Sequence, residues 1–163
     1  MQQALLAIGK AVWELQTLED GLATHLALRH DLAPGCSKAE LEQAMARRRA
    51  MTFGQLLQQP QLTASLSVEC LARLASLKAD RNWLIHASRR ALHVELYTPA
   101  TGANALARVE AITKQVGALR HDVWAETATY LHGVGLAPAT GAVNAILSHW
   151  ATGKRHPGEI GET

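Results

Sequence analysis

The apolar residues near the start of the chain recur at intervals of three and four positions, and this spacing restricts the fold more than any other feature. The members of the series are Leu5, Ile8, Val12, Leu15, Leu22 and Leu26. An α-helix turns through about 100° per residue, so these side chains share one helix face. Glu19 stands in the gap of the series, where a leucine is expected. The pattern predicts a long amphipathic helix from Gln2 to about His30.

A second helix is predicted from the residues that begin and end it. Ser37 is a typical N-cap, and Glu40, three positions later, completes a capping box. We expect this helix to continue to about Gln59, with a weak point at Gly54 and a stop at Pro60.

A third helix is predicted from about Thr63 to Ser88 and a fourth over about residues 103–131. The apolar face of the third consists of Leu66, Cys70, Leu74, Leu77, Leu84 and Ile85, with Arg81 among them. The apolar face of the fourth consists of Leu106, Val109, Ile112, Val116, Leu119 and Val123. Residues 91–102 are rich in β-formers and end in Pro99 and Gly102, which predicts an extended connection or a small hairpin arm.

A short fifth helix is predicted over 141–150, followed by a flexible tail over 153–163. The 163 residues fit one domain, here 1–152. We therefore expect an all-α protein, an antiparallel bundle of about four long helices with a short C-terminal helix.

Composition narrows the cellular setting. No apolar run approaches the roughly 18 residues of a membrane span, and the first residues do not resemble a secretory signal. Cys36 and Cys70 lie far apart without a CxxC spacing, which favours free thiols. These features predict a cytoplasmic protein without membrane contact.

The charge pattern permits a local basic surface but no charge-driven nucleic-acid binding. Sixteen basic and fourteen acidic residues leave a net charge of +2. The arginines cluster at Arg47, Arg48 and Arg49 and again at Arg89 and Arg90. Either cluster is a candidate basic patch, and solvated helix surface is the alternative for both. The eight histidines lack metal-ligand spacing and no nucleotide-binding motif occurs, so neither a metal nor a cofactor is expected.

Arg81 is out of place on its apolar face. A guanidinium among Leu77, Leu84 and Ile85 is costly to bury unless an anion or water meets it. One explanation is a structural ion pair with Glu19 or Glu14 of the first helix. The other is a polar cleft in which Arg81 binds an anionic ligand.

His86 follows Arg81 by five positions, which places the two about 140° apart on an ideal helix. Asn82 and His86, four positions apart, share a face. Arg81 and His86 meet only if the helix is distorted or if a two-fold axis brings a second copy to the site.

The segment from Asp80 to His86, DRNWLIH, resembles the signature of HEPN domains. In that superfamily an arginine, a polar residue that is often Asn, three variable residues and a histidine stand late in a long helix. Glu19 is similar to an acid that HEPN proteins often carry in their first helix. The likeness in helix order covers roughly residues 1–150.

This resemblance implies a metal-independent endoribonuclease that acts as a homodimer, with Arg81 and His86 of both chains in one cleft. Histidine supplies a proton acceptor and donor near neutral pH, and arginine supplies charge for the phosphorane. Asn82 is expected to orient His86 or bind phosphate, with Asp80 and Glu19 as supporting residues. The resemblance also implies that the basic clusters Arg47–Arg49 and Arg89–Arg90 guide the RNA strand, and Arg89 and Arg90, just past His86, are the better placed. HEPN toxins paired with nucleotidyltransferase antitoxins commonly carry a tyrosine two positions after the histidine, where this chain has Ser88.

Two functions therefore compete. The first is a HEPN-type ribonuclease, a toxin or prokaryotic defence effector, with RNA as substrate and an antitoxin or other antagonist as partner. The second is a non-catalytic helical module in which Arg81 and His86 form a polar cluster for ligand or partner recognition.

Overall fold

The structure is a computed structural model that describes residues 2–32, 36–88 and 99–134, a part of the chain that is helical without strands. Its elements are α1 (Gln2–Leu26), the π-helical turn η1 (Ala27–Asp31), α2 (Lys38–Arg49), α3 (Phe53–Leu57), α4 (Pro60–Thr63), α5 (Val68–His86) and α7 (Pro99–Gly133). The predicted all-α class is confirmed. The number of long helices differs from the expectation, because the described ranges hold three of them and several short ones.

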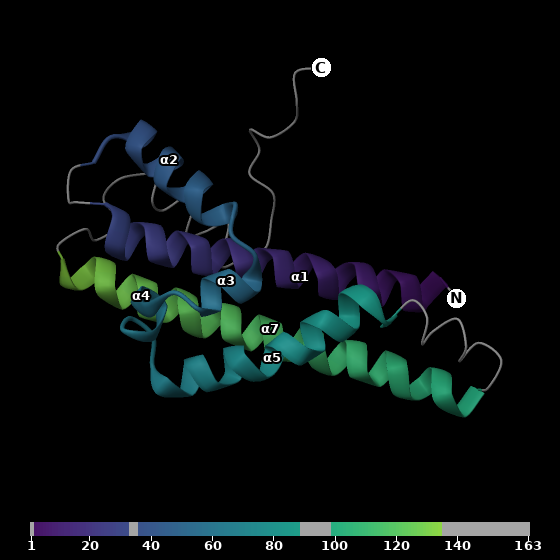
Figure 1. Cartoon of the computed structure of the whole chain (residues 1–163). Coiled ribbons are helices and arrows are strands. Elements are labelled where there is room, and N and C mark those ends of the chain that lie inside the picture. Colours follow the sequence, from purple (N-terminus) through teal and green to yellow (C-terminus); the bar gives the residue numbers. More distant parts are fainter. Residues whose placement is uncertain (1, 33–35, 89–98, 135–163) are drawn as a thin grey trace, which may run out of the picture.

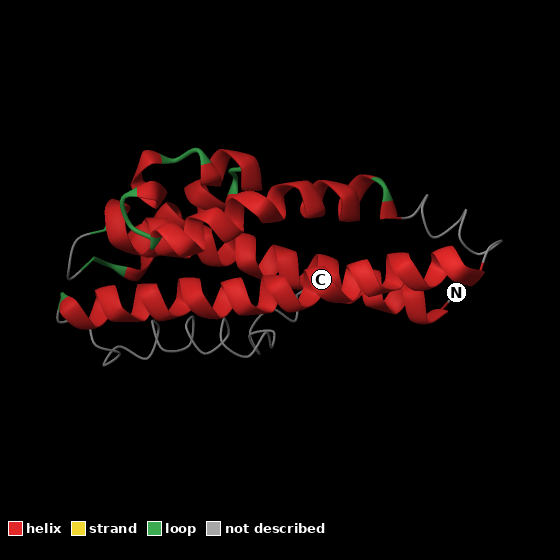
Figure 2. Cartoon of the chain, turned by 90° about the horizontal axis from the view of Figure 1, so that it is seen from below, coloured by secondary structure: helices red, strands yellow, loops and turns green. Residues whose placement is uncertain are grey.

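The long helices α1 and α7 run antiparallel and lie side by side (Figure 1). Helix α5 packs mainly on α7 and approaches α1 toward its own C-terminal end. The short helices α2, α3 and α4 gather over the C-terminal half of α1, at the end of the bundle away from the N-terminus (Figures 1 and 2). No helix in the described ranges is long and apolar enough to cross a membrane.

The core-facing side of α1 is shifted from the predicted one. The buried residues of the helix include Ala11, Leu15, Leu18, Leu22 and Leu26. Leu18 is fully buried although the predicted series omits it, whereas Leu5 is 61% exposed. At its N-terminal end α1 lies beside α7 (Figure 1), and Ile8 packs against the core there while Leu5 and Leu6 stay exposed. Glu19 therefore lies beside the core and does not replace a core leucine.

The predicted second helix is divided in two. The capping box of Ser37 and Glu40 is confirmed, with both reciprocal hydrogen bonds present. Helix α2 nevertheless ends at Arg49, because Thr52 forms a second capping box with Gln55 and begins α3. Helix α3 ends at Leu57, before Pro60 as predicted, but Pro60 also occupies the first turn of a further short helix, α4, where its missing N–H costs no hydrogen bond.

The later helix boundaries also differ from expectation. Helix α5 begins at Val68 with Ser67 as N-cap, so the segment after Thr63 is not part of it. Helix α7 begins at Pro99, and the predicted extended arm is wrong for residues 99–102. Residues 91–98 of that arm, the predicted helix 141–150 and the tail 153–163 lie outside the described residues.

A row of polar contacts runs along the whole seam between α5 and α7. From one end to the other the pairs are Ser67 with Glu126, Arg73 with Asp122, Ser76 with Gln115, and Asp80 with Arg108. The numbers rise on one helix as they fall on the other, so the helices are antiparallel and in fixed register. This seam positions the C-terminal half of α5, which carries the candidate site.

Candidate functional site

Arg81 faces α1, where it forms an ion pair with Glu19. Its Nε donates to Glu19 Oε1 at 3.4 Å, and the two side chains are 27% and 26% exposed. Of the two partners expected from sequence, Glu19 is the one found. Glu14 lies 3.0 Å from Arg120 instead, in a pair without the angles of a hydrogen bond. Arg81 thus lies at the edge of the core with partial access to solvent, and the Glu19 carboxylate neutralises its charge within the chain.

His86 and Asn82 lie on the outward side of α5. Both side chains are exposed, and α5 continues as a regular α-helix to His86. The distortion that would bring Arg81 and His86 together in one chain is therefore absent from α5. Within one copy, the structure brings Asn82 and His86 to a common face and leaves Arg81 on another.

Asp80 and Trp83 face α7, where Arg108 contacts both. The Arg108 Nη2 donates to Asp80 Oδ1 at 2.8 Å, and its Cζ lies 4.1 Å from the centre of the Trp83 ring. The guanidinium is thus held by a carboxylate and by an aromatic face at once. Sequence reasoning missed Arg108. The available signal was the spacing of seven positions between Arg108, Gln115 and Asp122, which aligns polar residues on one face of α7.

The first basic cluster does not form one surface. Arg48 is half-buried and donates from Nε and Nη2 to both carboxylate oxygens of Asp31, each at 2.7 Å. These hydrogen bonds lower the pKa of the Asp31 carboxyl below its ordinary value. Arg49 lies 3.3 Å from Asp20, and Arg47 is exposed. Arg89 and Arg90 lie outside the described residues.

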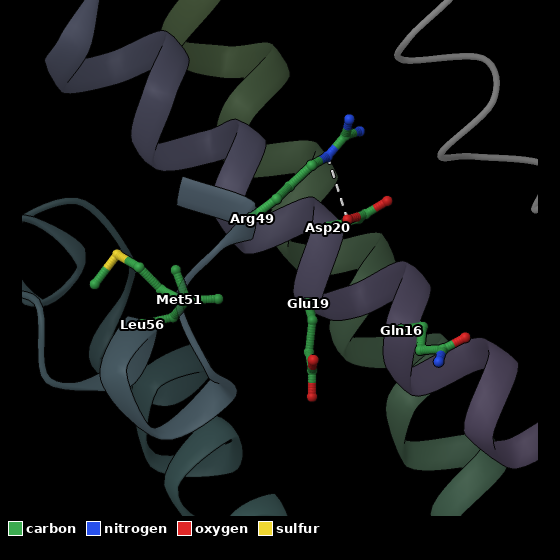
Figure 3. A pocket seen from close by; sticks show the side chains of 6 residues that line it. All are labelled: Gln16, Glu19, Asp20, Arg49, Met51 and Leu56. Atoms are coloured by element: carbon green, nitrogen blue, oxygen red, sulfur yellow. Dashed lines mark ion pairs between the residues drawn. The ribbon is translucent and has the colours of Figure 1, made fainter. Parts of the chain in front are cut away.

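A cavity of about 310 Å³ opens beside Glu19, between α1 and the segment that runs from the end of α2 into α3. Its lining consists of Gln16, Glu19, Asp20, Arg49, Met51 and Leu56 (Figure 3). Figure 3 shows Arg49 paired with Asp20, while the Glu19 carboxylate points away from that pair. Two carboxylates and one guanidinium give the cavity a mixed polar lining with an apolar wall.

A second cavity, of about 260 Å³, lies at the start of the α5–α7 seam. The Ser67 N–H donates to Glu126 Oε2 at 2.9 Å and its hydroxyl donates to Oε1 at 2.6 Å, so Glu126 stabilises the N-terminus of α5. Burial, together with the charges of Glu126 and Asp122, raises the pKa of the Cys70 thiol to about 11. Cys70 therefore remains a protonated core residue and lacks the thiolate of a nucleophile.

A buried polar cluster links α1, the segment before α5, and α7. His25 is 1% exposed; its Nδ1 lies 2.8 Å from Thr127 Oγ1 and its Nε2 lies 2.9 Å from Ser65 Oγ. The Thr127 hydroxyl also lies 2.6 Å from Val123 O and the Ser65 hydroxyl 3.2 Å from Leu62 O, so each hydroxyl is shared between the ring and a backbone carbonyl. In the neutral form one ring nitrogen donates to its hydroxyl and the other accepts from the second hydroxyl. Burial, with the nearby Arg29 and His30, lowers the pKa of His25 to about 4. Sequence reasoning missed this cluster as well, although a histidine inside GLATHLAL stands among apolar residues.

The described ranges hold no group of three or more His, Cys, Asp or Glu residues that is arranged to bind a metal ion. Comparisons with protein-family models, with curated proteins and with solved structures found no match to this chain. The case for a function therefore rests on the residues around the end of α5.

Proposed function

We propose that this chain is a HEPN-type, metal-independent endoribonuclease that cleaves RNA through its own 2′-hydroxyl. The observation that carries the proposal is an exposed histidine at the end of a long helix, with an exposed asparagine one turn before it and an arginine next to that asparagine. His86 would accept and donate the protons of the reaction, and Arg81 would stabilise the charge that develops on phosphate. Asn82, on the His86 face, would orient the imidazole or bind the phosphate.

The proposed enzyme is a homodimer. Arg81 and His86 point to different sides of α5 in one copy, so a common cleft requires groups from two copies. Exposed apolar residues near that end of the bundle support a second copy. Leu5 and Leu6 of α1 are 61% and 67% exposed, and Ile85 of α5 is 43% exposed. Their burial between copies would remove apolar surface from water.

The proposed biological role is a cytoplasmic toxin or defence effector that an antitoxin or other antagonist silences. Uncontrolled cleavage of RNA harms the cell that makes the enzyme, which is the reason to expect an antagonist. Ser88 replaces the tyrosine that nucleotidyltransferase antitoxins modify, so the proposed antagonist acts by another route.

The test is incubation of the purified chain with total RNA in the presence of a chelator. We expect cleavage by the wild type and a loss of about 100-fold or more in His86→Ala, because general acid–base catalysis contributes on that order. Arg81→Ala is expected to lose a similar factor, through weaker stabilisation of the phosphorane. Gel electrophoresis of the RNA measures cleavage, and circular dichroism with sedimentation checks that fold and dimer persist.

A matched arginine controls for the loss of an ion pair. Arg73 lies on the same helix as Arg81, in the half of α5 away from His86, and it pairs with Asp122 of α7. We expect Arg73→Ala to cleave RNA at the wild-type rate. Cleavage that requires added divalent metal, or that survives in His86→Ala, would contradict the proposal.

The second candidate is a non-catalytic helical module for ligand or partner recognition. The observation in its favour is the ion pair of Arg81 with Glu19, which gives this arginine a structural role without any substrate. On this alternative Arg81→Ala loses thermal stability, and neither the wild type nor the variant cleaves RNA.

A further inference from the structure

The side of α5 that leads to His86 carries Asp80 and Trp83. Residues three positions apart are neighbours on a helix surface, with about 5–6 Å between side-chain bases, so Trp83 is a neighbour of both Asp80 and His86. Each step of three also turns the side chain by about 60°, so this ridge of Asp80, Trp83 and His86 winds round the helix. Arg81 is not on this ridge, because it faces α1 and Glu19. Arg89 and Arg90, which follow His86, lie outside the described residues, so among the described residues a phosphate bound beside His86 in a single copy takes its cation from another element.

Arg108 of α7 is a cation that reaches this ridge. It contacts the first two ridge residues, Asp80 through Nη2 at 2.8 Å and the Trp83 ring at 4.1 Å. Its side chain is 44% exposed, so the guanidinium is open to a ligand from solvent. A guanidinium carries five N–H donors in one plane, and the bond to Asp80 occupies one nitrogen, which leaves donors for phosphate oxygens.

The contacts hold Arg108 in place before any ligand arrives. A free arginine side chain has about 2 kcal/mol of rotamer entropy to lose when it binds, and a held one loses less. Trp83 limits the side chain by stacking and Asp80 limits it by charge. The same carboxylate weakens the net positive potential, so Asp80 positions the arginine while reducing its attraction for anions.

We propose that Arg108 binds a phosphate of single-stranded RNA on the His86 side of α5, with Trp83 and Asp80 as its positioning residues. The ligand class rests on the ribonuclease function proposed above, but the site itself rests on the contacts of Arg108. Each copy of the chain then holds its own phosphate-binding residue over Trp83, one turn before His86, whatever a second copy contributes.

Binding of a labelled single-stranded 2′-O-methyl RNA, measured by fluorescence anisotropy, tests this site separately from cleavage. Such RNA lacks the 2′-hydroxyl nucleophile and is not cut. We expect Arg108→Ala to weaken binding about tenfold and to reduce the slope of log affinity against log salt by about 0.7, the value for one phosphate contact on a single strand. Arg108→Lys keeps the charge but loses the planar stack, so it should recover part of the affinity.

Two control variants distinguish an arginine that binds phosphate from one that only joins α5 to α7 by an ion pair. Asp80→Asn removes the ion pair but keeps the cation, and it should bind as tightly as the wild type or more tightly. Arg73→Ala removes the ion pair with Asp122 further along the seam and should leave the affinity for RNA unchanged. Wild-type affinity in Arg108→Ala, or an equal loss in Asp80→Asn, would overturn the phosphate contact.

The same assay distinguishes this inference from the proposed activity. Binding that depends on Arg108, combined with no cleavage of unmodified RNA, supports the phosphate site and refutes the nuclease. Cleavage that depends on His86 while Arg108→Ala binds normally refutes the phosphate site and leaves the nuclease standing.

Discussion

His25 shows how one buried residue ties distant parts of the chain together. Its two ring nitrogens contact hydroxyls from α7 and from the segment before α5, and Arg29 donates from Nη1 to Ser65 O at 3.1 Å in the same region. Each hydroxyl lies within hydrogen-bonding distance of a ring nitrogen and of a backbone carbonyl, so the polar atoms of this cluster all have partners. Burial of the imidazole, together with the nearby Arg29 and His30, lowers the pKa of His25.

The lowered pKa predicts a loss of stability in acid. Below its ordinary pKa of 6.5 the unfolded chain takes up a proton at His25, while the folded chain does so only near pH 4. The stabilisation is complete above pH 6.5 and declines as the pH falls to 4, by about 3 kcal/mol in total. Urea unfolding at pH 7 and at pH 4 measures the change.

The carboxylates also titrate in this range, so the comparison needs a variant that cannot take up the proton. In His25→Gln the decline between pH 7 and pH 4 should be smaller than in the wild type by about the same 3 kcal/mol. Equal declines in the two proteins would show that His25 is already protonated in the folded state.

At the scale of elements, capping decides where the helices begin. The run from Ser37 to Gln59 has few strong breakers, yet it divides because Thr52 and Gln55 satisfy each other's backbone N–H groups. The short helix α3 then turns Phe53 and Leu56 into the core, where each is 1% exposed. The capping box at the start of α3 thus allows Phe53 and Leu56 to join the core.

We therefore expect Thr52→Ala to lower the free energy of unfolding by about 1 kcal/mol, the usual cost of losing an N-cap side chain. Thr63 is the matched control, because it is exposed at the end of α4 and caps no helix. Thr63→Ala should change stability by less than about 0.5 kcal/mol. Chemical denaturation of both variants checks the difference, and equal effects would mean that α3 does not depend on its cap.

At the scale of the whole molecule, the pairing of α1 with α7 determines which apolar residues become core. Leu18 and Leu5 lie on the same helix with the same side chain, but one is 0% exposed and the other 61%. Burying a leucine side chain fully contributes about 1.5–3 kcal/mol. The stability lost when each leucine is shortened therefore reports whether its position belongs to the core.

Leu18→Ala is expected to destabilise the fold by about 2–5 kcal/mol, because it removes buried methyl groups and leaves a cavity between α1 and its neighbours. Leu5→Ala should cost less than about 1 kcal/mol in the monomer. Thermal unfolding at low protein concentration compares the two. A large effect of Leu5→Ala at high concentration alone would indicate that a second copy covers this residue.

Much of the fold was predictable because helices depend on residues within one or two turns of each other. The periodic spacing predicted the long helices, and Ser37 with Glu40 predicted a cap that the structure contains. The helix starts after Thr52, at Pro60 and at Pro99 were missed, since each of these residues is compatible with two local structures. Of the candidate site, the sequence pointed to Arg81 and to Glu19 or Glu14 as its partner, and the structure contains the pair with Glu19.

By itself the sequence determined that the chain is helical and that Arg81 needs an anion, because periodicity and the cost of a buried charge are local properties. Only the tertiary structure decided which anion it meets, and that Arg108 reaches the ridge below His86 from a helix more than twenty positions away. Such contacts depend on the register of α5 against α7, and register is set by packing over the whole seam. The relation of Arg81 to His86 is likewise a matter of helix orientation, which places them on different sides of α5.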